Sequence, residues 1–124
     1  NVTLGFGALG SDTKGNKSIA IGVDALTAQN FTSSTDTNNV AVGYQAGASV
    51  TTGRHNNFFG AVAGDAITDG ESNVAIGTAS LGSDTRGNFS VAIGHAALNS
   101  QNTTNDTDMY NTAVGYHAGT AVTR

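Results

Sequence analysis

The most constraining feature of this chain is a glycine that returns seven times, closing a short apolar motif of the form Asn/Ser-x-Ala-(Val/Ile/Leu)-Gly. These glycines are Gly5, Gly22, Gly43, Gly60, Gly77, Gly94 and Gly115. Their spacings are 17, 21, 17, 17, 17 and 21 residues, and each of the first three recurs 72 residues later. Residues 1–52 therefore align without a gap on residues 73–124, and roughly 30 of those 52 positions are identical. A fixed short period is typical of one small unit that is stacked repeatedly, so residues 1–124 are predicted to form a single repeat array.

Composition explains why stacking is needed. The chain is 38% hydrophobic, but much of this is alanine, with one Met and five Phe. So few large apolar side chains bury little surface in a single compact core, which favours a solenoid or an oligomer. The net charge is −4, and the five cationic residues form no cluster, which argues against nucleic acid and anionic membranes as partners. With no cysteine, the chain has no disulfide framework and no thiolate chemistry.

The residues before each glycine predict a short strand. β-Branched side chains alternate with alanine, the period of two that a strand shows. The apolar column that results is Val2, Ile19, Ile21, Val40, Val42, Val74, Ile76, Val91, Ile93 and Val114. A strand that is apolar on both faces is buried on both faces. If the alanine face fills a narrow interior, the Val/Ile face must be covered by neighbouring chains. The pattern leaves the reverse orientation open, and both orientations predict an oligomer.

A second ladder of small residues follows the glycine, and each rung is predicted to run as strand, tight corner, short second strand and outer loop. Glycines in this ladder permit the positive φ that a sharp corner needs. The Asn/Ser column that precedes each strand is expected to bond local turn backbone or to stack on itself. The fold class is therefore an all-β parallel β-roll or β-solenoid of seven rungs of 17 or 21 residues. Phe58-Phe59 departs from the usual pair and indicates either a wider rung or a strand shifted by one residue.

The strands resemble a known family of repeats. Ser18-Ile-Ala-Ile-Gly22, Asn39-Val-Ala-Val-Gly43, Asn73-Val-Ala-Ile-Gly77 and Ser90-Val-Ala-Ile-Gly94 carry the resemblance. They are similar to the YadA-like head repeats of trimeric autotransporter adhesins and to related repeats of bacteriophage tail fibres. The resemblance implies a left-handed parallel β-roll, three chains side by side, and an attachment role.

Two longer rungs carry extra polar loops, where a rigid scaffold often presents recognition residues. A solvated insertion without function is the alternative. The candidates for binding a glycan or receptor are the loop residues Gln29, Asn30, Phe31, Asp36, Gln101, Asn102, Asp106 and Asp108, together with Tyr44 and Tyr116. The two tyrosines stand directly after their glycines, in a variable column that predicts an outward position or packing on the adjacent loop.

No pattern of residues indicates catalysis, a cofactor or a metal. Asp106-x-Asp108 has oxygen ligands that suit Ca²⁺, but the earlier copy does not keep the pair, so ordinary loop acids are favoured. Asp12 and Asp84 are expected to bond their own turn backbone. His55, His95 and His117 stand at non-equivalent positions and are interpreted as structural.

The function expected from these observations is a non-enzymatic structural and host-attachment segment of a phage tail fibre. The expected assembly is a homotrimer, on an extracellular or virion surface, that meets a cell-surface glycan or protein receptor. A bacterial trimeric adhesin head is the alternative. A polysaccharide-acting β-solenoid enzyme is the alternative of another class, although it requires clustered carboxylates. An ice-binding solenoid would need a flat, regular Thr array, whereas Thr is expected here mainly in irregular loops.

Overall fold

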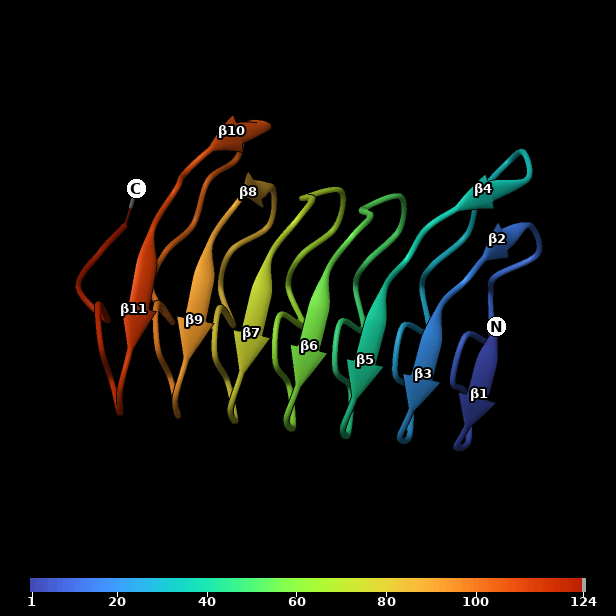
Figure 1. The fold of residues 1–124 in the computed structure, drawn as a ribbon, viewed down its shortest axis with the longest axis horizontal. Helices are drawn as coiled ribbons and strands as arrows, with labels where there is room; N and C mark the ends of the chain where they lie inside the picture. Colours follow the sequence, from blue (N-terminus) through green and yellow to red (C-terminus); the bar gives the residue numbers. More distant parts are fainter. Residues whose placement is uncertain (124) are drawn as a thin grey trace.

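The computed structural model describes residues 1–123, which form a parallel β-solenoid of seven turns without any helix (Figure 1). Each turn contributes one three-residue strand to a single sheet. These strands are β1 (Val2–Leu4), β3 (Ile19–Ile21), β5 (Val40–Val42), β6 (Asn57–Phe59), β7 (Val74–Ile76), β9 (Val91–Ile93) and β11 (Thr112–Val114). The prediction of an all-β parallel solenoid is therefore confirmed.

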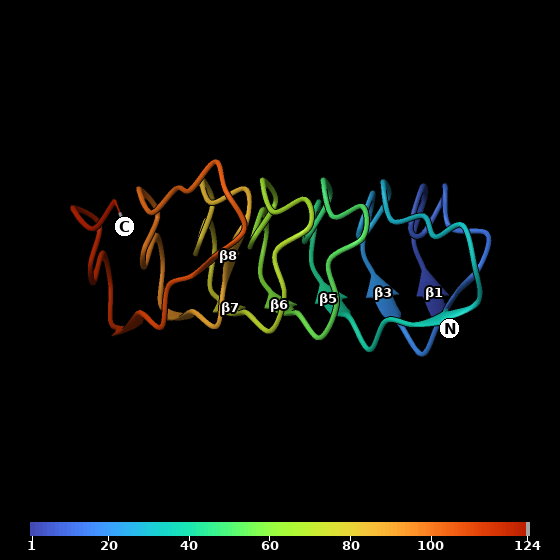
Figure 2. The same cartoon turned by 90° about the horizontal axis from the view of Figure 1, so that it is seen from above.

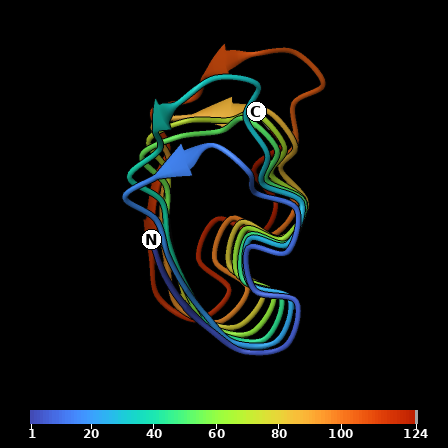
Figure 3. The same cartoon turned by 90° about the vertical axis from the view of Figure 1, so that its right-hand side faces the viewer.

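The sheet follows chain order, β1-β3-β5-β6-β7-β9-β11, so every strand pairs in parallel with the strand of the next turn. The register keeps equivalent residues opposite each other: Ala20 pairs with Ala41, and Ala41 pairs with Phe58. The Phe58-Phe59 strand is consequently not shifted. Viewed from above and from the side, the turns stack as a rod whose cross-section is indented on the side opposite the sheet (Figures 2 and 3).

Two pairs of shorter strands lie in the outer loops. β2 (Gly15–Asn16) pairs with β4 (Thr35–Asp36), and β8 (Gly87–Asn88) pairs with β10 (Thr107–Asp108). The β4 and β10 loops are the two longest; they rise from the same edge of the rod, and each leans over the preceding turn, toward β2 and β8 respectively (Figure 1).

The predicted second strand after each glycine is not formed among the described residues. The corner is a turn in which the second and fourth residues after the glycine have positive φ, a conformation outside the β region. Leu9, Leu26, Leu81 and Leu98 adopt φ of 48 to 53° at the same position where Gly47 and Gly64 adopt 59 and 58°. The corners still bond in parallel from turn to turn, as in Leu26 N–H to the Ala46 carbonyl at 3.1 Å. The small-residue ladder is thus a stack of turns.

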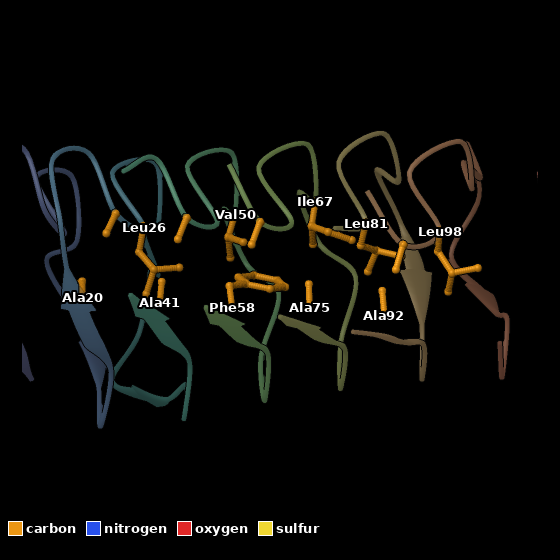
Figure 4. Close-up of a cluster of buried hydrophobic side chains, with 14 of the residues drawn as sticks. Ala20, Leu26, Ala41, Val50, Phe58, Ile67, Ala75, Leu81, Ala92 and Leu98 are labelled. Atoms are coloured by element: carbon orange, nitrogen blue, oxygen red, sulfur yellow. The ribbon is translucent and has the colours of Figure 1, made fainter. Parts of the chain in front are cut away.

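The alanine face of the sheet points inward, which decides the orientation that the pattern left open. Ala20, Ala41, Ala75 and Ala92 are fully buried. They face the side chains of the indented corner, among them Leu26 and Leu81 (Figure 4). A narrow interior between two close walls has room for a methyl group on the strand side and a larger side chain opposite.

Phe58 fits this interior because glycine faces it twice. The ring is fully buried, and a Cβ on Gly47 would lie 2.7 Å from its Cδ2 atom. A Cβ on Gly64 would lie 2.5 Å from its Cε1 atom. Where the strand carries alanine, the corner of the same turn carries leucine in most turns; where the strand carries phenylalanine, the neighbouring corners carry glycine. The ring is thus accommodated by exchanging volume across the interior, which requires neither a shifted strand nor a wider rung.

Candidate functional site

An interior ladder of asparagines positions the outer loops. The side chain of Asn56 accepts a hydrogen bond at Oδ1 from the backbone N–H of Asn73 (2.9 Å) and donates from Nδ2 to the Gly70 carbonyl (2.8 Å). Asn39 and Asn73 repeat both bonds in their own turns. The carbonyl partner is 14 residues away, so the expected bond to the local turn is wrong. The expected bonding between stacked asparagines is found, with each side chain accepting from the backbone N–H of the next asparagine in the column. Each buried amide therefore ties a strand start to an outer loop and to the next turn.

In the two long turns, serine replaces asparagine and a glutamine completes the network. Gln29 Nε2 donates to Asp12 Oδ2 at 2.8 Å, and its Oε1 accepts from Asn39 Nδ2 at 2.8 Å. Gln101 repeats this pattern with Asp84 at 2.5 Å and Asn111 at 2.8 Å. Both glutamines are fully buried. These two sequence candidates therefore offer no side-chain surface to a ligand in the single chain, because their polar atoms link three successive turns.

Asp12 and Asp84 bond their own turns, as predicted. Asp12 Oδ1 accepts from the Gly15 N–H at 2.9 Å, and Asp84 Oδ1 accepts from the Gly87 N–H at 3.0 Å. Each carboxylate also receives the glutamine of the following turn. The aspartate and the glutamine together fix the base of each long loop.

The first long loop presents Asn30 and Asp36 but not Phe31. The Asp36 carboxylate forms an exposed ion pair with the Lys17 ammonium at 2.6 Å, and Asn30 Oδ1 accepts from the Thr13 hydroxyl at 3.0 Å. Phe31 is only 9% exposed, so it is no aromatic platform for a ligand. Its ring serves the packing of the loop.

The second long loop presents Asn102, Asp106 and Asp108. Asn88 Nδ2 donates to Asp106 Oδ1 at 2.6 Å and to Asp108 Oδ1 at 3.2 Å, which brings the two carboxylates to one amide. The Tyr110 hydroxyl donates to Asp108 Oδ2 at 3.0 Å. This hydrogen bond and the charge of the carboxylate raise the pKa of the Tyr110 phenol above its ordinary value. The loop also contains a pocket of about 250 Å³, lined by Asn102, Thr103, Thr104, Asn105, Thr107 and Met109.

Tyr44 and Tyr116 lie outside the coil, as their variable column predicted, with 54% and 78% of their surfaces exposed. Tyr116 stacks on His95 of the preceding turn with ring centroids 5.4 Å apart. His117 lies 5.5 Å from the His95 ring. No column pattern in the sequence indicates this pair, because the two histidines stand one and two residues after their respective glycines.

The outer face of the sheet is apolar and open to solvent. We define this outer sheet face by the side chains on either side of the buried central residue of each strand. They are Val2, Leu4, Ile19, Ile21, Val40, Val42, Asn57, Phe59, Val74, Ile76, Val91, Ile93, Thr112 and Val114. None is charged, and even in the middle of the sheet Phe59 is 41% and Ile76 39% exposed. The interior ends at the alanine column, so the chain's own winding leaves this face uncovered.

Another regular column lies eight residues after each glycine and was not recognised in the sequence. It consists of Thr13, Asn30, Thr51, Thr68, Thr85, Asn102 and Thr123. The Thr51 hydroxyl donates to the Thr68 carbonyl at 3.1 Å, and the Thr68 hydroxyl donates to the Thr85 carbonyl at 2.9 Å. The threonines at the centre of the column therefore hold neighbouring turns together.

Comparison of the chain with protein-family models, with curated proteins and with solved structures finds no match. Within residues 1–123, no helix is long and apolar enough to cross a membrane. Over the same residues, no group of three or more His, Asp or Glu side chains is placed to hold a metal ion. The candidate functional surfaces are therefore the outer sheet face and the exposed parts of the two long loops.

Proposed function

We propose that this chain is a non-enzymatic structural and host-attachment segment of a trimeric fibre, with rungs of 17 or 21 residues. The observation that carries the proposal is the outer sheet face, an uncharged surface that continues over all seven turns and is apolar except at Asn57 and Thr112. Apolar patches of this kind on a folded protein are typical of an interface with another protein. Three copies that place this face along a common axis would bury it and leave the long loops outside.

The partner that fits this face best is another copy of the chain. A surface repeated at every turn is matched in length and spacing by the same surface on a second copy, and closed cyclic symmetry buries it on every subunit. The sequence resemblance to adhesin and phage-fibre repeats supports three copies. A phage tail fibre is the proposed source, with a bacterial surface adhesin head as the alternative.

The long loops are the proposed contact with a cell-surface glycan or protein receptor. In a trimer each loop would occur three times, so weak single contacts would add through avidity. Against the enzyme alternative, Asp106 and Asp108 converge on one amide of the loop rather than facing each other across a groove. The exposed candidates for contact are Asn30, Asp36, Asn102, Asp106 and Asp108. Tyr44 and Tyr116 are exposed too, but they follow the ends of β5 and β11, at the sheet edge opposite the β4 and β10 loops (Figure 1).

The native mass of the purified chain at micromolar concentration tests the assembly. We expect a trimer, and we expect Ile76→Asp to give a folded monomer because it places a carboxylate in the middle of the buried face. Thr52→Asp is the matched control, since it adds the same charge at an exposed side chain in an outer loop. A stable wild-type monomer with native circular dichroism would contradict the proposal. Binding of the labelled wild-type protein to intact bacterial cells, compared with Ile76→Asp, tests attachment separately.

A further inference from the structure

The two long loops are copies of one element that differ in how they fill their interior. In the first, β4 pairs with β2 through Gly15 and Thr35; in the second, β10 pairs with β8 through Gly87 and Thr107, which are the equivalent positions. Two positions that are buried or partly buried in both loops have exchanged large and small side chains. Phe31 of the first loop corresponds to Thr103 of the second, and Thr37 corresponds to Met109.

In the first loop, this interior is closed. Phe31 is 9% exposed and Thr37 is fully buried. The Thr37 hydroxyl bonds the Ser18 hydroxyl and donates to the Asn16 carbonyl at 2.9 Å. An aromatic ring and a bonded hydroxyl thus anchor the loop to the solenoid.

In the second loop, the pocket of about 250 Å³ lies against the position where the phenylalanine is missing. Thr103 is 8% exposed, and its hydroxyl is used within the loop, donating to the Asn105 carbonyl at 2.8 Å. The loop keeps its shape through this bond and through Thr107, whose hydroxyl donates to the same carbonyl at 3.1 Å. The replacement of a phenyl ring by threonine leaves space that the loop does not refill.

We propose that this pocket binds one neutral sugar ring, and that the first long loop lacks the site because Phe31 fills it. The inference rests on the proposed attachment function, for which it names the receptor chemistry. The side-chain nitrogen Nδ2 of Asn102, the Thr104 hydroxyl and the Asn105 side-chain amide make no hydrogen bond with any other residue in 1–123. These groups are available to sugar hydroxyls, and the half-buried Met109 offers an apolar contact for the C–H face of the ring.

The charges around the pocket select against acidic sugars. Asp106 and Asp108 belong to the same loop, and Asp84 lies beneath it, where its Oδ1 accepts from the Thr103 N–H at 3.3 Å. Among residues 1–123, the cation beside the pocket is Arg86, which is paired with Asp69 at 2.6 Å and whose Nη1 donates to the Thr104 carbonyl at 3.5 Å. A carboxylate-bearing sugar would therefore meet the like charge of these aspartates, and the Arg86 guanidinium is already paired with Asp69; a neutral hexose or N-acetylhexosamine meets no such repulsion.

The pocket is small, below the usual volume of sites for drug-sized ligands, and it is walled by short polar side chains. One ring at the end or in a branch of a glycan matches this size better than an extended chain. Repetition on three subunits would then supply the avidity that one shallow site lacks.

The two loops provide reciprocal variants as a test. We expect saturation-transfer NMR and titration with the methyl glycosides of glucose, galactose, mannose and N-acetylglucosamine to detect at least one ligand, and N-acetylneuraminic acid to bind at least tenfold more weakly. Thr103→Phe copies the first loop and should weaken binding at least tenfold. Phe31→Thr, which copies the second loop, should add a site and raise the number of sugars bound per chain. Thr52→Phe introduces the same ring at an exposed side chain elsewhere and should leave binding unchanged.

Wild-type protein that binds none of the four glycosides at tens of millimolar overturns the proposal. Unchanged affinity in Thr103→Phe, or equal binding of the acidic sugar, also overturns it. Circular dichroism checks that both variants are folded. If Thr103→Phe loses sugar binding only because it is unfolded, Phe31→Thr decides the question: an unchanged number of sugars bound per chain in that variant overturns the proposal. Native mass on the same samples separates the two proposals: a monomer that binds sugar contradicts only the fibre assembly, and a trimer that attaches to cells without binding sugar contradicts only the pocket.

Discussion

At the scale of single residues, the glycine at the end of each strand is required partly because the backbone of the next turn lies against it. Gly60 has a φ of +135°, and a Cβ there would lie 2.7 Å from the carbonyl carbon of Gly77. Gly115 has a φ of +133°, but its nearest neighbour would be the Ala118 Cβ at 3.8 Å. Both positions demand a backbone conformation that L-residues avoid, and only the first adds a collision with backbone.

We therefore predict that Gly60→Ala costs more stability than Gly115→Ala. Strain alone costs about 1–3 kcal/mol at either site, and the contact with Gly77 should raise the cost at Gly60 above about 3 kcal/mol. Urea denaturation followed by circular dichroism measures both. Equal losses in the two variants would mean that stacking of the turns does not contribute to the requirement for glycine.

At the scale of the element, the volume of the side chain at the centre of each strand is matched to the volume of the side chains in the corners that face it. Leucine in the corner accompanies a polar side chain three residues later, as in Leu81 with Asp84, whereas glycine accompanies an aliphatic one, as in Gly64 with Ile67. Phe58 belongs to the second kind of turn and fills the space that leucine fills in the first. The leucines of this column hold positive φ, and burial of their side chains offsets that strain.

This balance predicts a compensating pair of substitutions. Phe58→Ala should lose about 3–5 kcal/mol because it empties a fully buried site. Gly64→Leu alone should also destabilise, since its side chain collides with the ring. The double variant should recover most of the loss, because alanine opposite leucine is the packing of neighbouring turns. A double-mutant cycle from chemical denaturation measures the coupling, and strictly additive losses would refute the exchange of volume.

At the scale of the whole molecule, the corner has one fixed length and the outer loop does not. Every turn keeps eight residues from its glycine to the Thr/Asn column, while the segment beyond that column includes the β4 and β10 loops. Interactions pass mainly between adjacent turns, so the array is expected to accept a complete additional turn.

Duplicating residues 56–72 after Ser72 should give a folded rod longer by about 4.8 Å. The second copy of Phe58 would face a glycine in the corner of its own turn and another in the corner of the preceding turn. The added Asn56 would continue the interior ladder of asparagines. The matched control duplicates the same segment without Ala63, which removes one residue from the corner and misplaces every side chain after it. Thermal unfolding and small-angle scattering compare the two, and equal stability would show that the corner does not set the register.

Much of the fold was predictable from the sequence because every turn repeats the same local backbone structure and the same pattern of side chains. The period, the strand positions, the outward tyrosines and the turn bonds of Asp12 and Asp84 follow from column patterns and short-range chemistry. The second strand was predicted wrongly because small residues in a repeating column suit a stack of turns as well as a strand. The candidate loops were located, but Gln29, Gln101 and Phe31 were assigned to the surface on polarity and loop position alone, and burial places them inside.

The sequence by itself determined that seven equivalent units stack in parallel, because a strict period with a glycine at each strand end admits one repeated backbone. Only the tertiary structure decided which face of the strand is covered, since both faces are apolar and the choice depends on the width of the interior. The same width places Phe58 between two glycines. In the long loops, the exchange of Phe31 for Thr103 separates a closed interior from one with a pocket. These outcomes depend on volumes contributed by different turns, and no single column contains that information.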